Sequence, residues 1–182
     1  ELRLIPDFFS KELFYDEFPN KKAEIVTSIA MFYDLEDPRE FASDIHHVLD
    51  DEGIWHFEQS YMPSMLRTNA YDTICHEHLE FYSLKVVKDL LESVQFKIID
   101  VQTNSINGGS FAVTAAKKKS KHISNKVLID WMLFEEKQMK LDTLEPYLNF
   151  KERIFKHRES LKYLINNLVK SSKTVFGYGA ST

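Results

Sequence analysis

Glycine, proline and cysteine are all scarce in this sequence. Its 182 residues include five glycines, five prolines and one cysteine. Glycine and proline together therefore reach only about half of their usual share, which favours regular secondary structure over tight turns. The single cysteine, Cys75, excludes a disulfide framework and a cysteine zinc cluster within these residues. It also favours a reducing compartment, and we expect a cytoplasmic protein.

The few glycines are too scattered to form a phosphate-binding loop. Gly53, Gly108 and Gly109 are the glycines in the body of the chain, and Gly177 and Gly179 fall within the last six residues. A loop that cradles a phosphate or a dinucleotide needs closely spaced glycines directly after a strand. The body of this chain therefore contains no such loop.

Excess positive charge and long apolar runs are also missing. The chain has 23 Lys and Arg residues against 28 Asp and Glu residues, a net charge of −5. This balance argues against a nucleic-acid partner and against a basic membrane-binding patch, and no run approaches the roughly 18 apolar residues that cross a bilayer. Hydrophobic residues make up 43% of the chain, which is enough for a packed core. The oligomeric state is left open.

The first part of the chain reads as a strand, a helix and a second strand. Residues 22–33 are mostly apolar, which is typical of a strand buried on both faces. Asp37 is expected to cap a helix that begins at Pro38, and residues 50–53 to end it. A strand is predicted at 54–57. A strand, a helix and a strand with short joints predict a parallel sheet.

The next elements predict an antiparallel addition to that sheet. Ser83 is expected to cap a second helix, and two β-rich runs at 97–104 and 110–117 flank an Asn-Gly pair, which indicates a hairpin. A mostly parallel sheet closed by an antiparallel strand is typical of an α/β, Rossmann-like methyltransferase fold. This step is an analogy between folds.

The last third of the chain has a helical pattern. It runs from about 123 to 170, and Pro146 either breaks it or lies in the first turn of a second helix. Residues 174–182 then place a short apolar strand before Gly-x-Gly-Ala-Ser, which is how a nucleotide-binding turn begins. A frayed tail is the alternative interpretation.

The chemically densest part of the chain surrounds three consecutive polar residues. These are His76, Glu77 and His78, with Cys75 directly before them and Tyr82 shortly after. Histidine is the side chain most easily tuned to give or take a proton near neutral pH. Acid–base catalysis, a metal site and a polar loop of structural histidines all stay open. The metal site lacks an evident third ligand and the His-Glu-x-x-His spacing.

Glu58 and Gln59 are a second pair of polar candidates. They follow a predicted strand at the end where parallel sheets present their ligand groups. A loop carboxylate and a loop amide without function are the alternative.

Four stretches of the chain occur together in one family. They are FEQSYMP at 57–63, YDTICHEHLEFYSL at 71–84, NGGS at 107–110 and FGYGAST at 176–182. In this order they resemble the S-adenosylmethionine-dependent C-methyltransferases that act on nucleotide-linked keto-sugars. The resemblance covers essentially the whole chain, but only the central part of the family's usual length.

The resemblance implies a domain organisation. Residues 1–120 would be the C-terminal part of the methyl-donor domain, 121–172 a helical connector, and 173–182 the start of a second Rossmann-like domain. The chain is then expected to be cut at both ends. Zinc would be bound only in a cysteine-rich domain outside this chain, and no metal ligand is expected within it.

The resemblance also implies roles for individual residues. His78 would be the general base, Glu77 its partner or a second polar contact, and His76 a secondary candidate. The residues that would line the S-adenosylmethionine site are Ala30, Met31, Phe32 and Glu58. The residues that would contact a small-molecule nucleotide sugar are Cys75, Tyr82, Asn107 and Gly179.

Two departures from the family pattern leave the sugar open. Cys75 stands where tyrosine is common, and residues 28–32 lack the Asn and His that are common there. Two other functions also stay open. One is a non-catalytic Rossmann-like binding or assembly module with residues 123–170 as a partner surface, and the other is an O-methyltransferase.

Overall fold

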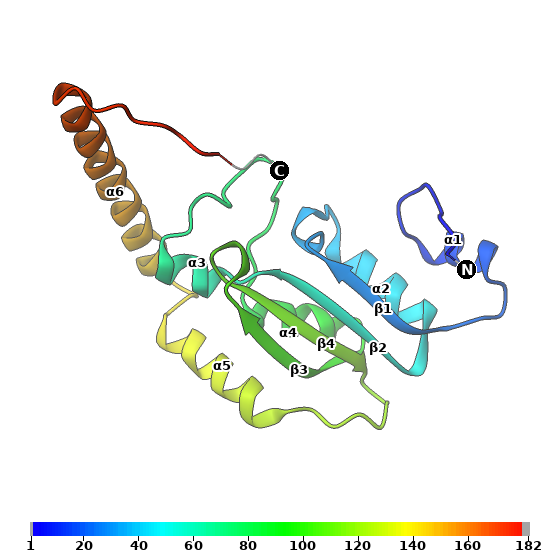
Figure 1. Ribbon diagram of the computed structural model, residues 1–182. Coiled ribbons are helices and arrows are strands. Elements are labelled where there is room, and N and C mark those ends of the chain that lie inside the picture. Colours follow the sequence, from blue (N-terminus) through cyan, green and yellow to red (C-terminus); the bar gives the residue numbers. More distant parts are fainter. Residues whose placement is uncertain (1, 180–182) are drawn as a thin grey trace.

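A computed structural model describes residues 2–179, except for the side chain of Asn107. Within that range, four strands form one sheet in the order β1-β2-β4-β3 (Figure 1). Their bounds are β1 (Ala23–Ile29), β2 (Leu49–Ser60), β3 (Phe96–Asn104) and β4 (Ser110–Lys117). β1 and β2 are parallel, whereas β4 is antiparallel to both β2 and β3. The predicted α/β fold and the predicted hairpin are therefore confirmed.

Helices accompany this sheet on one face and at its ends. In the described part of the chain they are α1 (Lys11–Glu17), α2 (Pro38–Val48), α3 (Met62–Thr68), α4 (Leu84–Ser93), α5 (Lys126–Gln138), α6 (Glu145–Lys170) and the 3₁₀ helices η1 (Phe32–Asp34) and η2 (Ile106–Gly108). Pro146 lies in the first turn of α6. Pro146 therefore belongs to the start of a second helix and does not break a single long one. Its missing N–H costs nothing there, because amides in the first turn have no partner within the helix.

Two helices begin where the sequence predicts. The Asp37 carboxylate accepts hydrogen bonds from the backbone amides of Arg39 and Glu40 at the start of α2. The Ser83 hydroxyl accepts one from the amide of Val86 at the start of α4. Each cap satisfies amides that the first helical turn leaves without partners. The turns that lead into both helices are therefore fixed by local hydrogen bonds.

The core lies between the sheet and the helices α2 and α4. Trp55 and Phe57 project from β2 toward Ile45 of α2 and Leu91 of α4, and all four are fully buried. Trp55 also donates from Nε1 to the Ser28 hydroxyl of β1, at 3.0 Å. These contacts hold the ends of β1 and β2 together, and polar segments follow both strands there.

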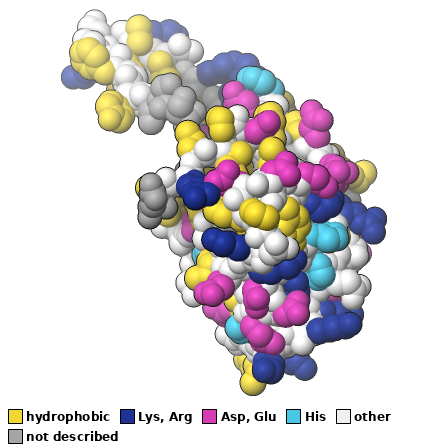
Figure 2. Space-filling view, turned by 90° about the vertical axis from the view of Figure 1, so that its right-hand side faces the viewer, with side chains coloured by type: hydrophobic (Ala, Val, Ile, Leu, Met, Phe, Trp, Pro, Cys, Tyr) yellow, Lys and Arg dark blue, Asp and Glu magenta, His cyan; other side chains and the backbone are white. Residues whose placement is uncertain are grey.

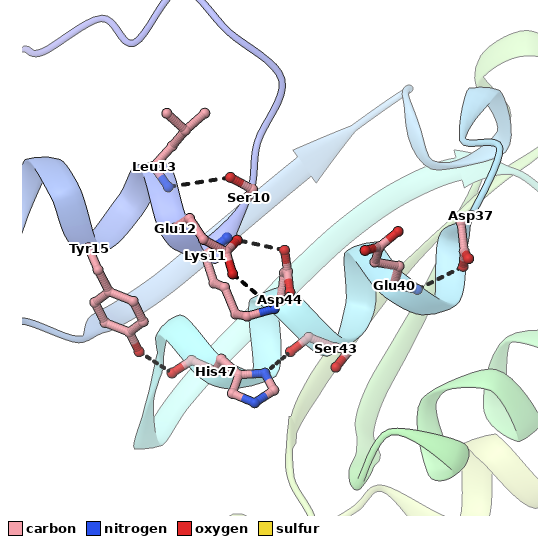
Figure 3. Close-up of polar contacts among 10 residues, drawn as sticks. All are labelled: Ser10, Lys11, Glu12, Leu13, Tyr15, Asp37, Glu40, Ser43, Asp44 and His47. Atoms are coloured by element: carbon pink, nitrogen blue, oxygen red, sulfur yellow. Dashed lines mark hydrogen bonds and ion pairs between the residues drawn. The ribbon is translucent and has the colours of Figure 1, made fainter.

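A network of polar contacts attaches α1 to α2 (Figure 3). The Lys11 ammonium lies 2.9 Å from the Asp44 carboxylate, and the Lys11 backbone amide donates to the same carboxylate. Tyr15 donates to the carbonyl oxygen of His47. Asp44 is almost fully buried, so this carboxylate depends on its partners from α1.

The prediction that residues 22–33 form a strand buried on both faces is wrong. β1 ends at Ile29, and residues 32–34 form η1 instead. Ile25 and Ile29 are 65% and 55% exposed. The physical reason is that β1 is an edge strand of the described sheet, with β2 as its neighbour on one side.

Two further predictions need correction. Residues 50–53 were expected to end a helix, but they lie inside β2, which already begins at Leu49. Residues 174–176 were expected to form a short strand before the Gly-x-Gly turn, but residues 174–179 are exposed and have no regular structure. The rest of that motif, 180–182, lies outside the described residues. The domain boundaries at 120 and 172 stay predictions.

The surface carries charges of both signs. On the face shown in Figure 2, Lys and Arg side chains are interspersed with Asp and Glu side chains. No helix within residues 2–179 is long and apolar enough to cross a membrane.

Candidate active site

The polar stretch around His78 lies in an irregular segment that joins α3 to α4. We call residues 69–83 the His78 segment. The backbone amides of Leu79 and Glu80 both donate to the carbonyl oxygen of Tyr33 in η1, at 3.0 and 3.1 Å. The amide of Met62 donates to the carbonyl oxygen of Tyr82, at 2.9 Å. The segment is thereby attached beside the carboxyl ends of β1 and β2.

The His78 ring is held by a backbone carbonyl. Its Nδ1 atom lies 2.8 Å from the carbonyl oxygen of Thr73. A carbonyl oxygen can only accept, so Nδ1 carries the proton, and Nε2 of the neutral ring keeps a free electron pair. The half-buried ring also packs on Tyr33, with 4.3 Å between centroids. This arrangement fixes both the tautomer and the orientation of a potential base.

Asp34 is an acidic neighbour of His78 that the sequence analysis missed. Burial raises the pKa of the Asp34 carboxyl group, the charge of His78 opposes this rise, and the charge of Glu77 adds to it. The place of Asp34 in η1, directly after a parallel strand, was the available signal.

The residues beside His78 are arranged differently from what the family pattern suggests. Glu77 and His76 are an exposed pair, with Oε1 and Nε2 3.6 Å apart and side chains 71% and 91% exposed. Within the described residues, no hydrogen bond joins Glu77 to His78. Thr73 therefore provides the contact that was expected from Glu77, while the roles of Glu77 and His76 stay predictions.

The four residues predicted to contact the methyl donor lie at or just after the ends of β1 and β2. The side chain of one of them, Phe32, is buried in the core. The Ala30 amide donates to the carbonyl oxygen of Glu58, at 2.8 Å. The Glu58 carboxylate accepts from the side chain of Asn104, at 2.9 Å. Ala30 is exposed, and Met31 and Glu58 are half-buried. Phe32 is fully buried in the aromatic core, so its side chain has no free surface.

The predicted substrate contacts are not all brought together. Cys75 is half-buried within the His78 segment. Tyr82 is 3% exposed, and within the described part of the chain its hydroxyl has no hydrogen-bond partner. Burial raises the pKa of this hydroxyl, which therefore stays protonated. Gly179 is exposed, and nothing lies within 4 Å of the position that a Cβ would take there. The side chain of Asn107 lies outside the described residues.

Gln59 is an unusual neighbour of this site. Its side chain is 2% exposed, yet neither amide atom has a hydrogen-bond partner among the residues that the structure describes. It lies opposite Phe111 of β4 and shares a strand face with Phe57 and Tyr61. Its surroundings on the sheet are therefore aromatic, and a buried amide without partners destabilises the fold.

Comparison with known proteins places the chain in a family. A model of a methyltransferase domain matches residues 6–101, and a model of a C-methyltransferase C-terminal domain matches residues 105–182. The chain belongs to the S-adenosylmethionine-dependent C-methyltransferase family. The C-methyltransferase NovU of Streptomyces niveus is 31% identical to it over 160 residues. That match covers 88% of this chain but 38% of NovU, so the chain spans less than half of that relative.

Several solved methyltransferase structures show weaker similarity. The methyltransferase solved with the Trm112 activator of Haloferax volcanii is 11% identical, with a TM-score of 0.46 over 57% of this chain and 58% of that one. The N-methyltransferase NodS of Bradyrhizobium japonicum is 12% identical, with a TM-score of 0.41 over 54% and 53% of the two chains.

The cofactor that the family implies is compatible with the residues at the sheet edge. Open α/β sheets bind ligands beyond the carboxyl ends of their parallel strands, where Ala30, Met31 and Glu58 lie. Met31 offers a half-buried apolar side chain, and Glu58 offers carboxylate oxygens that accept from hydroxyl or ammonium groups. S-adenosylmethionine carries apolar, hydroxyl and ammonium groups, which these side chains can contact.

The metal interpretation of the His-Glu-His stretch receives no geometric support. Within residues 2–179, no three His, Cys, Asp or Glu side chains are grouped so that they could hold a metal ion.

Proposed function

We propose that this chain is part of an enzyme that transfers a methyl group from S-adenosylmethionine to a carbon atom beside a ketone of a nucleotide-linked sugar, with His78 as the general base. The observation that carries the proposal is the contact between His78 Nδ1 and the Thr73 carbonyl oxygen. It leaves Nε2 as the basic atom of a ring whose position is fixed. The motif that carries the family resemblance, 71–84, contains this ring.

The chemistry requires the removal of a weakly acidic proton. The Nε2 atom of His78 takes the proton from the carbon beside the ketone, and the electron pair of that C–H bond then forms the new carbon–carbon bond. When bound, the cofactor would supply the electrophilic methyl group, and the electron pair of its broken S–CH₃ bond would leave with S-adenosylhomocysteine. The Nδ1–H bond to the Thr73 carbonyl oxygen holds the ring in place during this proton transfer.

Two observations support a nucleotide-sugar substrate. One is the order of the family motifs along the sequence, and the other is the position of two of these motifs in the structure. Stretches 57–63 and 71–84 meet in space, because Tyr61 and Tyr82 pair as neighbouring extended residues. Both stretches lie beside the proposed donor site. A polar segment at this edge is suited to contacting hydroxyl and carbonyl groups of a sugar.

Product analysis tests this proposal. The full-length protein would be incubated with S-adenosylmethionine carrying a ¹³C-labelled methyl group and with a panel of nucleotide-linked keto-sugars. We expect NMR to show the labelled methyl on the carbon beside the ketone. A methyl group on oxygen would identify an O-methyltransferase, and no transfer to any sugar would support the non-catalytic module; either result overturns the proposal.

A further inference from the structure

The two ends of the His78 segment are both attached to the helices that follow the sheet. The segment begins after α3 and ends before α4, and Figure 1 shows it as a long green path between these two helices. α6 begins next to α3 (Figure 1), and α5 packs against α4. The helices α6 and α5 therefore pack against the two helices, α3 and α4, that flank the segment.

Arg153 of α6 binds the start of the segment. Its Nε donates to the Asn69 side-chain oxygen at 2.8 Å, and its Nη2 donates to the carbonyl oxygen of Leu66 at 2.5 Å. Leu66 is in the last turn of α3, and Asn69 ends that helix in the left-handed region with a φ of 57°. The forked guanidinium thus satisfies a carbonyl that the helix leaves open and fixes the residue at which the segment begins.

A second contact from α6 lies nearby. The Tyr71 hydroxyl is 3.0 Å from Nδ1 of His157, one helical turn beyond Arg153. Phe150, on the same side of α6, is buried with Met65 and Leu66 of α3. The start of the segment therefore rests on α6 through both polar and apolar contacts.

Glu136 of α5 binds the first residues of α4, which directly follow the other end of the segment. It is 3% exposed and accepts from three donors: the Tyr61 hydroxyl at 2.7 Å, the Leu84 amide at 2.6 Å and the Lys85 amide at 2.9 Å. Carboxylates are favourable at helix N-termini, where backbone amides lack partners. Burial of Tyr61, together with the charge of Glu136, raises the pKa of that hydroxyl and keeps it a donor.

We propose that Arg153 and Glu136 are positioning residues that hold the two ends of the His78 segment and thereby set the place of the His78 ring. Residues 71–77 have no helix or strand of their own, so their position depends on the contacts at the two ends of the segment together with those of Leu79 and Glu80 to Tyr33. The kinetic part of this inference rests on the proposed function of His78. The structural part is independent of it.

Arg153 is the better position for a test, because it is on the surface and its replacement leaves the core intact. The test compares Arg153→Gln with Arg158→Gln, a matched change at an exposed residue of the same helix. Measurements on the full-length protein are hydrogen–deuterium exchange, thermal unfolding, and kcat and KM for methyl transfer. Arg153→Lys is included because an ammonium cannot replace the fork that reaches both Asn69 and Leu66.

We expect amide exchange within residues 69–83 to become faster in Arg153→Gln and to stay unchanged in Arg158→Gln. We also expect kcat to fall by about tenfold or more, because displacement of a base by a fraction of an ångström impairs proton transfer. The KM for S-adenosylmethionine and the unfolding temperature should change little, and Arg153→Lys should resemble Arg153→Gln.

The outcomes separate this inference from the proposed function. Unchanged exchange in the segment of Arg153→Gln would overturn the positioning role. Faster exchange with an unchanged kcat would support the positioning role and contradict the assignment of His78 as the base. Glu136→Gln should accelerate exchange near Leu84, but its burial makes a loss of overall stability expected as well, so Arg153 decides the question.

Discussion

The Nδ1 atom of His78 lies 2.8 Å from the carbonyl oxygen of Thr73, five residues earlier in the same segment. This contact assigns the proton to Nδ1 and the free electron pair to Nε2. Thr73 acts here through its backbone, so its side chain is not required for the contact. The orientation of the His78 ring then depends on the path of the segment between these two residues.

Glu77 is expected to have a supporting role only. Its carboxylate is exposed and paired with His76, and exposed pairs contribute little. We expect Glu77→Gln to lower kcat by less than about tenfold, a loss well below that of a missing general base. A steady-state assay of labelled methyl transfer measures this. A loss as large as that of His78→Asn would show that Glu77 acts directly in the proton transfer.

Gln59 offers a test of stability. Replacing a buried amide that has no partners by an apolar side chain of similar size removes a desolvation penalty. We expect Gln59→Met to raise the free energy of unfolding by about 1–2 kcal/mol, measured by urea denaturation. Gln138→Met, an exposed change at the end of α5, is the control and should stay near the parent protein.

The opposite result at Gln59 would also be informative. A clear destabilisation in Gln59→Met would mean that the amide is bonded in solution, for example to buried water. It would contradict the description of Gln59 as an unsatisfied group.

His46 predicts a pH dependence of stability. Burial lowers the pKa of His46, and the charges of Lys117 and His47 lower it further. The folded state thus binds this proton less readily than the unfolded state, so stability is full above the ordinary histidine pKa of about 6.5 and is lost as the pH falls below it. We expect the unfolding temperature to drop between about pH 7.5 and 5.5, and to drop less in His46→Gln.

The control for His46 is His122→Gln. This variant removes a different imidazole, one that is bonded to the carbonyl oxygen of Glu52. Equal slopes in all three proteins would show that His46 does not titrate differently in the folded state.

Local signals in the sequence predicted much of the fold. Asp37 and Ser83 were recognisable as helix caps, because a cap acts within three residues of itself. The runs at 97–104 and 110–117 indicated their strands, and the Asn-Gly pair between them indicated the hairpin. β1 was misjudged because apolar composition alone does not distinguish an edge strand from a central one.

The candidate site was less predictable, because its contacts join distant parts of the chain. Arg153 lies 84 residues from Asn69, and no periodic pattern links them. Glutamate is typical of exposed helix surfaces, yet the Glu136 side chain is buried and accepts hydrogen bonds from three donors. The partner of His78 is a backbone carbonyl, which no residue type can reveal. The density of titratable groups pointed to the stretch 76–78, and the family resemblance singled out His78, whose role as the base stays a prediction.

The most direct test of the central claim is proton exchange at the substrate carbon. The full-length protein would be held in deuterated water with a nucleotide-linked keto-sugar and S-adenosylhomocysteine, and deuterium entry beside the ketone would be followed by NMR. We predict that His78→Asn lowers this rate by about 10²- to 10⁴-fold, that His122→Asn leaves it unchanged, and that both variants bind S-adenosylmethionine as the parent protein does. Exchange at the parent rate in His78→Asn would contradict the assignment of His78 as the general base.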